Sequence, residues 1–280
     1  MPSSPMPTMD SQRRDAALSG GTGSTRDMRI LILGGTTEAR QLAERLAKRT
    51  DLTVMLSLAG RTAAPVLQPV PVRVGGFGGA GGLADYLANQ KIDVLIDATH
   101  PYAAMISANA ANAAPRAGVP LLALRRPGWA PVTGDRWIEV GDIAGAVREL
   151  GNTSRRVFLV LGRKEIEPFA DAPQHHYVVR SIDPVVPPLA VPHAVYITGR
   201  GPFDKADERR ILEQHRIDVI VAKNSGGTAT YGKIAAARAL GLPVIMLRRP
   251  VLPDVEAVET VDDALVWLDH TLALATARGV

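Results

Sequence analysis

The chain of 280 residues is long for one hydrophobic core and favours two domains. Its 46% hydrophobic and 21% charged residues are typical of a soluble globular protein, and no apolar run reaches the roughly 20 residues of a membrane span. The lack of cysteine excludes disulfides, thiolate metal sites and a cysteine nucleophile, and it fits a cytoplasmic location. A net charge of +4 with 4% aromatic residues argues against nucleic-acid binding, and the histidines have no metal-ligand spacing.

The folded part of the chain is expected to begin at Met28. Residues 1–27 are rich in Ser, Gly, Pro and Arg without helical or strand periodicity, so we predict a disordered tail there. The apolar run Ile30–Leu33 then leads through a glycine-threonine turn into an amphipathic helix, Glu38–Arg49. This order of strand, tight turn and helix is typical of α/β domains.

Further apolar runs predict later strands at Leu52–Leu56, Val70–Val74, Ile92–Asp97 and Leu121–Leu124. Continuous apolar strands that alternate with amphipathic helices are typical of a parallel sheet covered on both faces. The predicted fold class is therefore α/β, with doubly wound parallel sheets.

The second half of the chain repeats the first. The segment from Lys91 to Pro127 has a partner from Arg216 to Pro250, and each begins with a charged residue and Ile-Asp-Val and ends with Arg-Arg-Pro. We infer two tandem Rossmann-like domains related by internal duplication, residues 28–152 and 153–280. The segment 137–150 fits against either domain.

The first predicted turn suits a nucleotide. Gly34 and Gly35 let the backbone approach a pyrophosphate at a helix N-terminus, and Thr36 and Thr37 supply hydroxyl groups. The pattern departs from G-x-G-x-x-G, so it is a weak signal alone.

The ends of the next two strands favour NADPH as the cofactor. Ser57, Arg61 and Thr62 follow the second strand in place of the Asp or Glu of NAD sites, although a solvated Arg in a turn would look the same. The loop with Gly76 and Phe77 follows the third strand and either wraps the cofactor or serves as a flexible connection.

The fourth predicted strand ends where a nicotinamide lies in a dinucleotide fold. Thr99, His100 and Tyr102 follow it, and we expect Thr99 and His100 to contact the cofactor. His100 would alternatively contact the substrate, and a lone histidine is more often structural. His100, Tyr102 and Lys223 are candidates for proton transfer or positioning, but no paired acid and base is evident and solvent would also serve.

The second domain is predicted to hold a polycarboxylate or phosphate-bearing molecule. Gly227, Gly232 and Lys233 have the spacing of a P-loop, but Ile234 replaces the magnesium-binding hydroxyl and is expected to face a core. Cationic loops rich in glycine favour an anion, although solvated charges would look the same. The candidate substrate-binding residues are Arg163, Lys164, Arg200, Gly201, Lys223, Asn224, Ser225, Gly226, Thr230 and Lys233.

Motifs from both halves together resemble the precorrin-6A reductase family of cobalamin biosynthesis. They are LILGGTTEARQLAERL, SLAGRT, DATHPYA, TGRGPF and KNSGG followed by KIAAARALGLPVIMLRRP, in this order from about residue 28 to residue 270. The resemblance implies NADPH-dependent reduction of precorrin-6A to precorrin-6B, a macrocyclic tetrapyrrole edged with carboxylates. It adds Glu38 to the expected cofactor residues and implies transient contacts with neighbouring enzymes of the pathway.

Three other functions stay open. The cobalt-precorrin-6A reductase of the anaerobic route is closely similar, and a non-catalytic NADPH-binding sensor would share the cofactor loop. Another NADP-dependent reductase or epimerase would generally use a Tyr-x-x-x-Lys pair. No such pair follows Tyr102 or Tyr231, because Ile106 and Ala235 stand at the required spacing.

Overall fold

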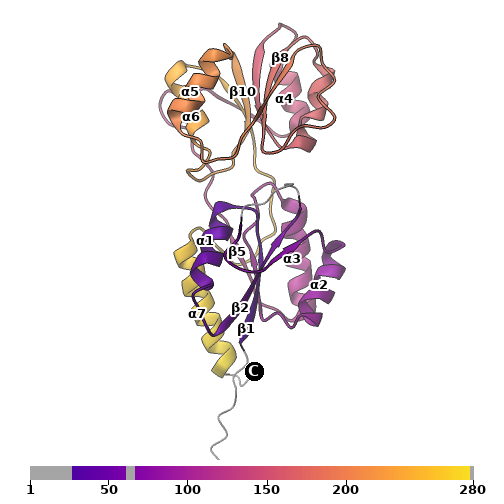
Figure 1. Cartoon of the computed structure of the whole chain (residues 1–280), viewed down its shortest axis with the longest axis vertical. Coiled ribbons are helices and arrows are strands. Elements are labelled where there is room, and N and C mark those ends of the chain that lie inside the picture. Colours follow the sequence, from indigo (N-terminus) through magenta and orange to yellow (C-terminus); the bar gives the residue numbers. More distant parts are fainter. Residues whose placement is uncertain (1–26, 61–66, 278–280) are drawn as a thin grey trace, which may run out of the picture.

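A computed structural model describes residues 27–60 and 67–277. It contains two domains, stacked along the long axis of Figure 1, and each is a parallel sheet of six strands with helices on both faces. We call the domain that contains β1 the first domain and the domain that contains β7 the second. In the described residues no helix is long and apolar enough to cross a membrane.

The first domain has the strand order β12-β5-β4-β1-β2-β3. Its strands are β1 (Met28–Leu33), β2 (Leu52–Leu58), β3 (Val72–Val74), β4 (Val94–Asp97), β5 (Leu121–Leu124) and β12 (Ala257–Val258). Its helices are α1 (Thr37–Leu46), α2 (Gly79–Asn89), α3 (Ala104–Ala117) and α7 (Val261–Ala277). The apolar faces of α1 and α7 cover one side of the sheet, and those of α2 and α3 cover the other.

The second domain has the equivalent order β6-β11-β10-β7-β8-β9. Its strands are β6 (Trp137–Val140), β7 (Arg156–Val160), β8 (His176–Ser181), β9 (Ala194–Thr198), β10 (Val219–Lys223) and β11 (Val244–Leu247). Its helices are α4 (Ile143–Leu150), the 3-10 turns η1 (Arg163–Glu165) and η2 (Glu167–Asp171), α5 (Lys205–Gln214) and α6 (Gly232–Leu240).

Local details support the internal duplication. Lys91 and Arg216, at equivalent positions before Ile-Asp-Val, have positive φ values of 50° and 51°. The backbone N–H groups of Arg29 and Arg156 each donate to the Asp of that motif, at 2.8 and 2.7 Å. The predicted fold class is confirmed, and so is the core position of Ile234, which is fully buried.

The two domains exchange their last strand and helix, which corrects the predicted division at residue 152. Strand β6 pairs with β11 of the second sheet, and β12 pairs with β5 of the first. Residues 137–150 therefore pack in the second domain, whereas β12 and α7 return to the first, where α7 lies beside α1 (Figure 1). The chain consequently crosses between the domains twice, after β5 and after β11.

Candidate functional site

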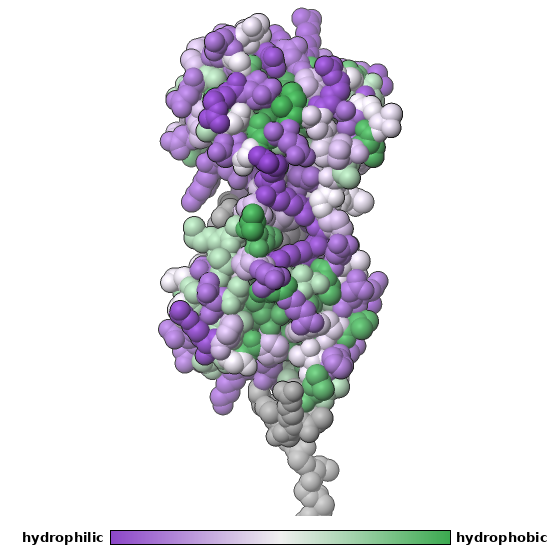
Figure 2. Space-filling model, turned by 180° about the vertical axis from the view of Figure 1, so that it is seen from behind, coloured by the Kyte–Doolittle hydropathy of each residue, from purple (hydrophilic) through white to green (hydrophobic). Residues whose placement is uncertain are grey.

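A cleft of about 210 Å³ lies at the carboxyl edge of the first sheet, beside the second domain. The strand order reverses between β1 and β4, and such a switch point is where open α/β sheets bind ligands. Predicted residues Thr36, Glu38, Thr99 and His100 all line the cleft. Seen from behind, Figure 2 shows a narrow waist between the domains where hydrophilic side chains gather.

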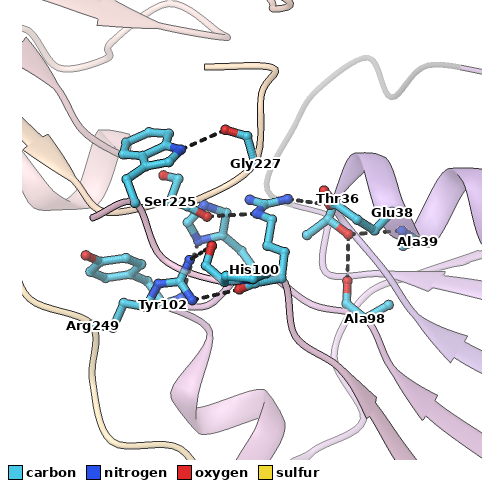
Figure 3. A network of polar contacts seen from close by, with 12 residues as sticks. Thr36, Glu38, Ala39, Ala98, His100, Tyr102, Ser225, Gly227 and Arg249 are labelled. Atoms are coloured by element: carbon cyan, nitrogen blue, oxygen red, sulfur yellow. Dashed lines mark hydrogen bonds and ion pairs between the residues drawn. The ribbon is translucent and has the colours of Figure 1, made fainter. Parts of the chain in front are cut away.

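In the turn between β1 and α1, Gly35 faces open space. The hydroxyl of Thr36 donates to Ala98 O at 2.8 Å and accepts from the N–H of Ala39 at 3.1 Å, so it caps α1 and ties the turn to β4 (Figure 3). Gly35 has a φ of +122°, and no described atom lies within 4 Å of a Cβ built on it. A ligand can therefore approach this backbone closely.

The loop after β4 is ordered by Asp97 and His100. Asp97 is buried and accepts from both the N–H and the hydroxyl of Thr99, at 3.1 and 2.7 Å. The Nδ1 atom of His100 accepts from the N–H of Tyr102 at 3.3 Å. A neutral imidazole with this bond carries its proton on Nε2.

Tyr102 reaches from the first domain into the second. Its hydroxyl donates to Leu247 O at the end of β11 and accepts from the N–H of Asn224 at 2.8 Å. Burial raises the pKa of Tyr102 to about 12. Tyr102 is thus a contact between the domains and a weak acid at neutral pH.

Two arginines from the repeated Arg-Arg-Pro motifs join the domains. Arg126 forms an ion pair with Glu38 and donates through Nε to Ser225 O at 2.7 Å. Arg249 donates to Asn224 O and Arg126 O, at 2.9 and 2.8 Å. Figure 3 shows Glu38, His100, Ser225 and Arg249 converging from both domains.

The turn after β7 in the second domain is closed by the side chain of Glu165, which belongs to the same turn. Glu165 accepts from the N–H of Gly162 at 2.7 Å and from Nζ of Lys223 at 2.7 Å, so Lys223 is already paired. Of the predicted substrate residues, Arg163 and Lys164 are exposed in η1. Arg200 is exposed and Gly201 partly buried, in the loop after β9.

The loop after β10 lies against the crossing segment of the first domain. The side chain of Asn224 is engaged with the backbone of Trp129, accepting from its N–H at 2.7 Å and donating to its O at 2.8 Å. Gly226 is buried beside Pro127 O. The loop is therefore fixed against the segment that follows β5.

Lys233 requires a correction, because its side chain is enclosed in the second domain. It is 2% exposed, its Nζ donates to Thr230 O at 2.6 Å, and it lies 4.7 Å from the centre of the Trp129 ring. Burial lowers the pKa of Lys233 to about 7. An enclosed ammonium group cannot contact a macrocycle in the cleft.

The remaining predicted cofactor residues lie along the same edge of the first sheet. Ser57 is buried at the end of β2, and Gly76 and Phe77 are in the loop after β3. Arg73 stacks on Phe77 at 3.8 Å and donates to Gly76 O at 2.7 Å. Arg61 and Thr62 lie outside the described residues.

Four residues that contact the cleft or its turns were missed at the sequence level. They are Arg73, Arg126, Trp129 and Arg249, and only Arg126 and Arg249 gave a signal, as part of the repeated Arg-Arg-Pro that indicated duplication. Arg126, Trp129 and Arg249 each make a contact with a residue about 100 positions or more away, such as that of Arg126 with Ser225, and local patterns do not contain that information.

Comparisons with known proteins agree with these motifs. A precorrin-6A reductase from Sinorhizobium sp is 57% identical over 91% of this chain and 97% of its own length. A solved structure, "CobK precorrin-6A reductase", is 45% identical, covers 87% of this chain and 97% of that chain, and has a TM-score of 0.84. A cobalt-precorrin-6A reductase from Priestia megaterium is more distant, at 29% identity over 79% of this chain and 90% of its own.

The profile of the family "Precorrin-6x reductase CbiJ/CobK" matches residues 29–269, which include both sheets and the exchanged strands. The chain therefore belongs to the precorrin-6x reductase family.

Proposed function

We propose that this protein reduces precorrin-6A to precorrin-6B in cobalamin biosynthesis, with NADPH as the reductant. The observation that carries the proposal is the cleft at the switch point of the first sheet. It is lined by the turn at Thr36 and Glu38, by the loop after β4, and by Arg126 and Arg249 on the two segments that connect the domains. Hydride transfer depends mainly on holding the nicotinamide against one face of the macrocycle, and a cleft where two domains meet is suited to that task.

The first domain fits the cofactor. Gly35 has room for a pyrophosphate, and a Cβ built on Gly76 or Gly78 also meets no described atom within 4 Å. We assign NADPH to the turn at residues 34–38, to Ser57, and to the glycine-rich loop after β3. When bound, NADPH supplies the hydride. Thr99 and His100 then lie at the end of β4, beside the expected place of the nicotinamide.

NADPH in preference to NADH is the finer part of this proposal. We assign Arg61 to the 2′-phosphate, because no acidic residue follows β2 before it. Arg61→Ala should weaken binding of NADPH far more than binding of NADH. An equal loss for both cofactors in titrations of the two would overturn this role.

The chain's own groups orient the substrate and deliver a proton. The exposed cations Arg163 and Lys164 after β7 and Arg200 after β9, together with the loop after β10, are suited to the carboxylates of a tetrapyrrole. For the proton we favour His100 over Tyr102 and Lys223, because Tyr102 is a weak acid bound to Leu247 O and Lys223 is paired with Glu165. Brief contacts with neighbouring pathway enzymes and a cytoplasmic location belong to the same proposal.

The decisive experiment incubates purified protein with precorrin-6A and NADPH and follows NADPH absorbance and the pigment spectrum. Cobalt-precorrin-6A is tested in parallel as the alternative substrate. We expect the metal-free pigment to be reduced faster, because the relative at 57% identity is named for it and the relative named for the cobalt form is 29% identical. NADPH binding without any change in either pigment would favour the sensor function instead.

A further inference from the structure

Three residues form a polar chain across the cleft. Glu38 lies in the first turn of α1, and Ser225 lies after β10 in the second domain (Figure 3). Arg126 lies between them in sequence, on the crossing segment after β5. Arg126 contacts both others at once, through its ion pair with Glu38 and its bond to Ser225 O at 2.7 Å. Its side chain is 14% exposed and that of Glu38 is 21% exposed, so solvent screens the pair only partly.

The position of Glu38 creates an electrostatic problem. The N-terminus of α1 is where a diphosphate would bind, and a second negative charge in the same turn repels it. Arg126, on the segment after β5, neutralises that charge through its ion pair with Glu38. The cofactor turn therefore depends on a residue that is about 90 positions away along the chain.

The same guanidinium is packed tightly against the second domain. A Cβ built on Gly227 would lie 3.1 Å from Cδ of Arg126 and 3.4 Å from Oε1 of Glu38. A Cβ built on Gly226 would lie 2.1 Å from Pro127 O. Only glycine therefore leaves room for Arg126 at this place, and Arg126 is also bonded to Ser225 O, so we expect a displacement of Arg126 to be felt by the loop at residues 224–227.

We propose that Arg126 is a positioning residue that couples occupancy of the cofactor turn to the placement of the second-domain loop at residues 224–227. It compensates Glu38 beside the bound anion and holds Ser225 O in place. The proposal rests on NADPH binding at the turn of the first domain. Because coupling between two sites is reciprocal, substrate bound on the loop then tightens NADPH.

The test compares Arg126→Ala, Glu38→Gln and the double variant, with Arg40→Ala as the control. Arg40 is on α1, the helix that also carries Glu38, and it pairs with Glu44 at 2.8 Å on the exposed surface. Arg40→Ala therefore removes one positive charge, as Arg126→Ala does, but away from the cleft. NADPH affinity is measured by fluorescence titration. We expect Arg126→Ala to weaken NADPH about tenfold, the double variant to recover most of that loss, and Arg40→Ala to have no effect.

Hydrogen–deuterium exchange of residues 224–230, with and without NADPH, reports the coupling directly. NADPH should protect this loop in the wild-type protein and in Arg40→Ala but not in Arg126→Ala. The double variant lacks the contact between Arg126 and the loop, as Arg126→Ala does, but it also lacks the negative charge of Glu38. If NADPH affinity recovers in the double variant, the loss in Arg126→Ala was caused by the uncompensated charge and not by general damage to the fold.

Equal NADPH affinity of Arg126→Ala and the wild-type protein, or loop protection that survives in Arg126→Ala, would overturn this inference while leaving the proposed function intact. If the wild-type protein binds no NADPH, the proposed function fails first and this inference fails with it.

Discussion

The turns after β1 and β7 are equivalent segments with opposite properties. In the first, Thr36 caps the helix and Gly35 faces open space. In the second, the carboxylate of Glu165 accepts from the N–H of Gly162, which is the group that a phosphate would need. One side chain placed on its own turn is enough to convert an anion-binding backbone into a closed one.

The next strand shows the same contrast. Ser57 of β2 and Arg180 of β8 occupy equivalent positions in the two sheets. Leu33 of β1 pairs with Ser57. In the second sheet Leu159 pairs with Val179, so the next residue of β7, which is the equivalent of Leu33, lies beside Arg180. Arg180 is buried, forms an ion pair with Glu208, and stacks on Phe203 at 3.9 Å. Where the first domain has a small side chain at the ligand edge, the second has filled the space with a buried ion pair.

The largest expected effect comes from breaking that ion pair. Glu208→Ala leaves the guanidinium of Arg180 buried without its partner and should lower the free energy of unfolding by about 3–5 kcal/mol. Glu213→Ala, which removes an exposed ion pair from the same helix, should cost less than about 1 kcal/mol. Urea unfolding followed by tryptophan fluorescence measures both free energies. Similar losses in the two variants would contradict the view that the buried ion pair fills the ligand edge of the second sheet.

The next effect is on pH dependence and concerns Lys233. Aligned by their terminal glycines, α6 carries Lys233 where α3 carries the buried Ala110. The pKa of Lys233 is about 7 in the folded protein against an ordinary value of 10.5, so between these values the unfolded chain binds a proton that the folded chain does not. Stability should therefore rise with pH across this window, and the cost of burial is fully present below it.

Lys233→Met tests that sign. Relative to this variant, the wild-type protein should gain roughly 1 kcal/mol of unfolding free energy per pH unit above pH 7. Denaturant titrations at several pH values measure the difference. Parallel pH profiles would show that Lys233 is charged in the folded state, held by Thr230 O and Glu208.

A matched pair of glycine substitutions tests the comparison of the turns directly. Gly35→Ala places a side chain at a φ of +122° and in the cofactor space, and NADPH affinity should fall about 10- to 100-fold. Gly162→Ala only displaces the carboxylate of Glu165, whose Oε2 would be 2.8 Å from the new Cβ. It should leave NADPH affinity unchanged. Equal weakening by both would place part of the cofactor site in the second domain.

The smallest effect is expected at Tyr102, whose hydroxyl links the first domain to the loop after β10 and to the end of β11. Tyr102→Phe removes two hydrogen bonds between the domains and should cost about 1–2 kcal/mol of stability. Turnover should persist with an unchanged pH profile, because a phenol with a pKa of about 12 is a poor proton donor. Loss of turnover together with a shifted pH profile would instead make Tyr102 the donor.

Much of the fold could be predicted because buried parallel strands are continuous apolar runs. The predicted strand limits Leu121–Leu124 agree with the structure, and both sheets have the equivalent strand order that a duplication implies. The exchange of β6 and β12 could not be predicted, since both are short edge strands before similar helices and fit either sheet equally well. Position along the chain was a poor guide to position in the fold.

The candidate site was predictable only where a turn or strand end determines it. Thr36, Thr99 and His100 line the cleft because each follows a buried strand at the same edge of the sheet. Lys233 was misplaced because its glycine-rich surroundings imitate a phosphate loop, while its burial depends on α5 and Trp129. Arg126 was overlooked because its partner Glu38 belongs to a different part of the chain.

The exchanged strands have a mechanical consequence. Because each domain borrows its last strand and helix from the other half of the sequence, two separate segments connect the domains, one leading into β6 and one into β12. Two parallel connections permit bending about the line that joins them but resist twisting and separation. A cut between the repeats would therefore separate each sheet from the edge strand and helix that complete it in the intact protein.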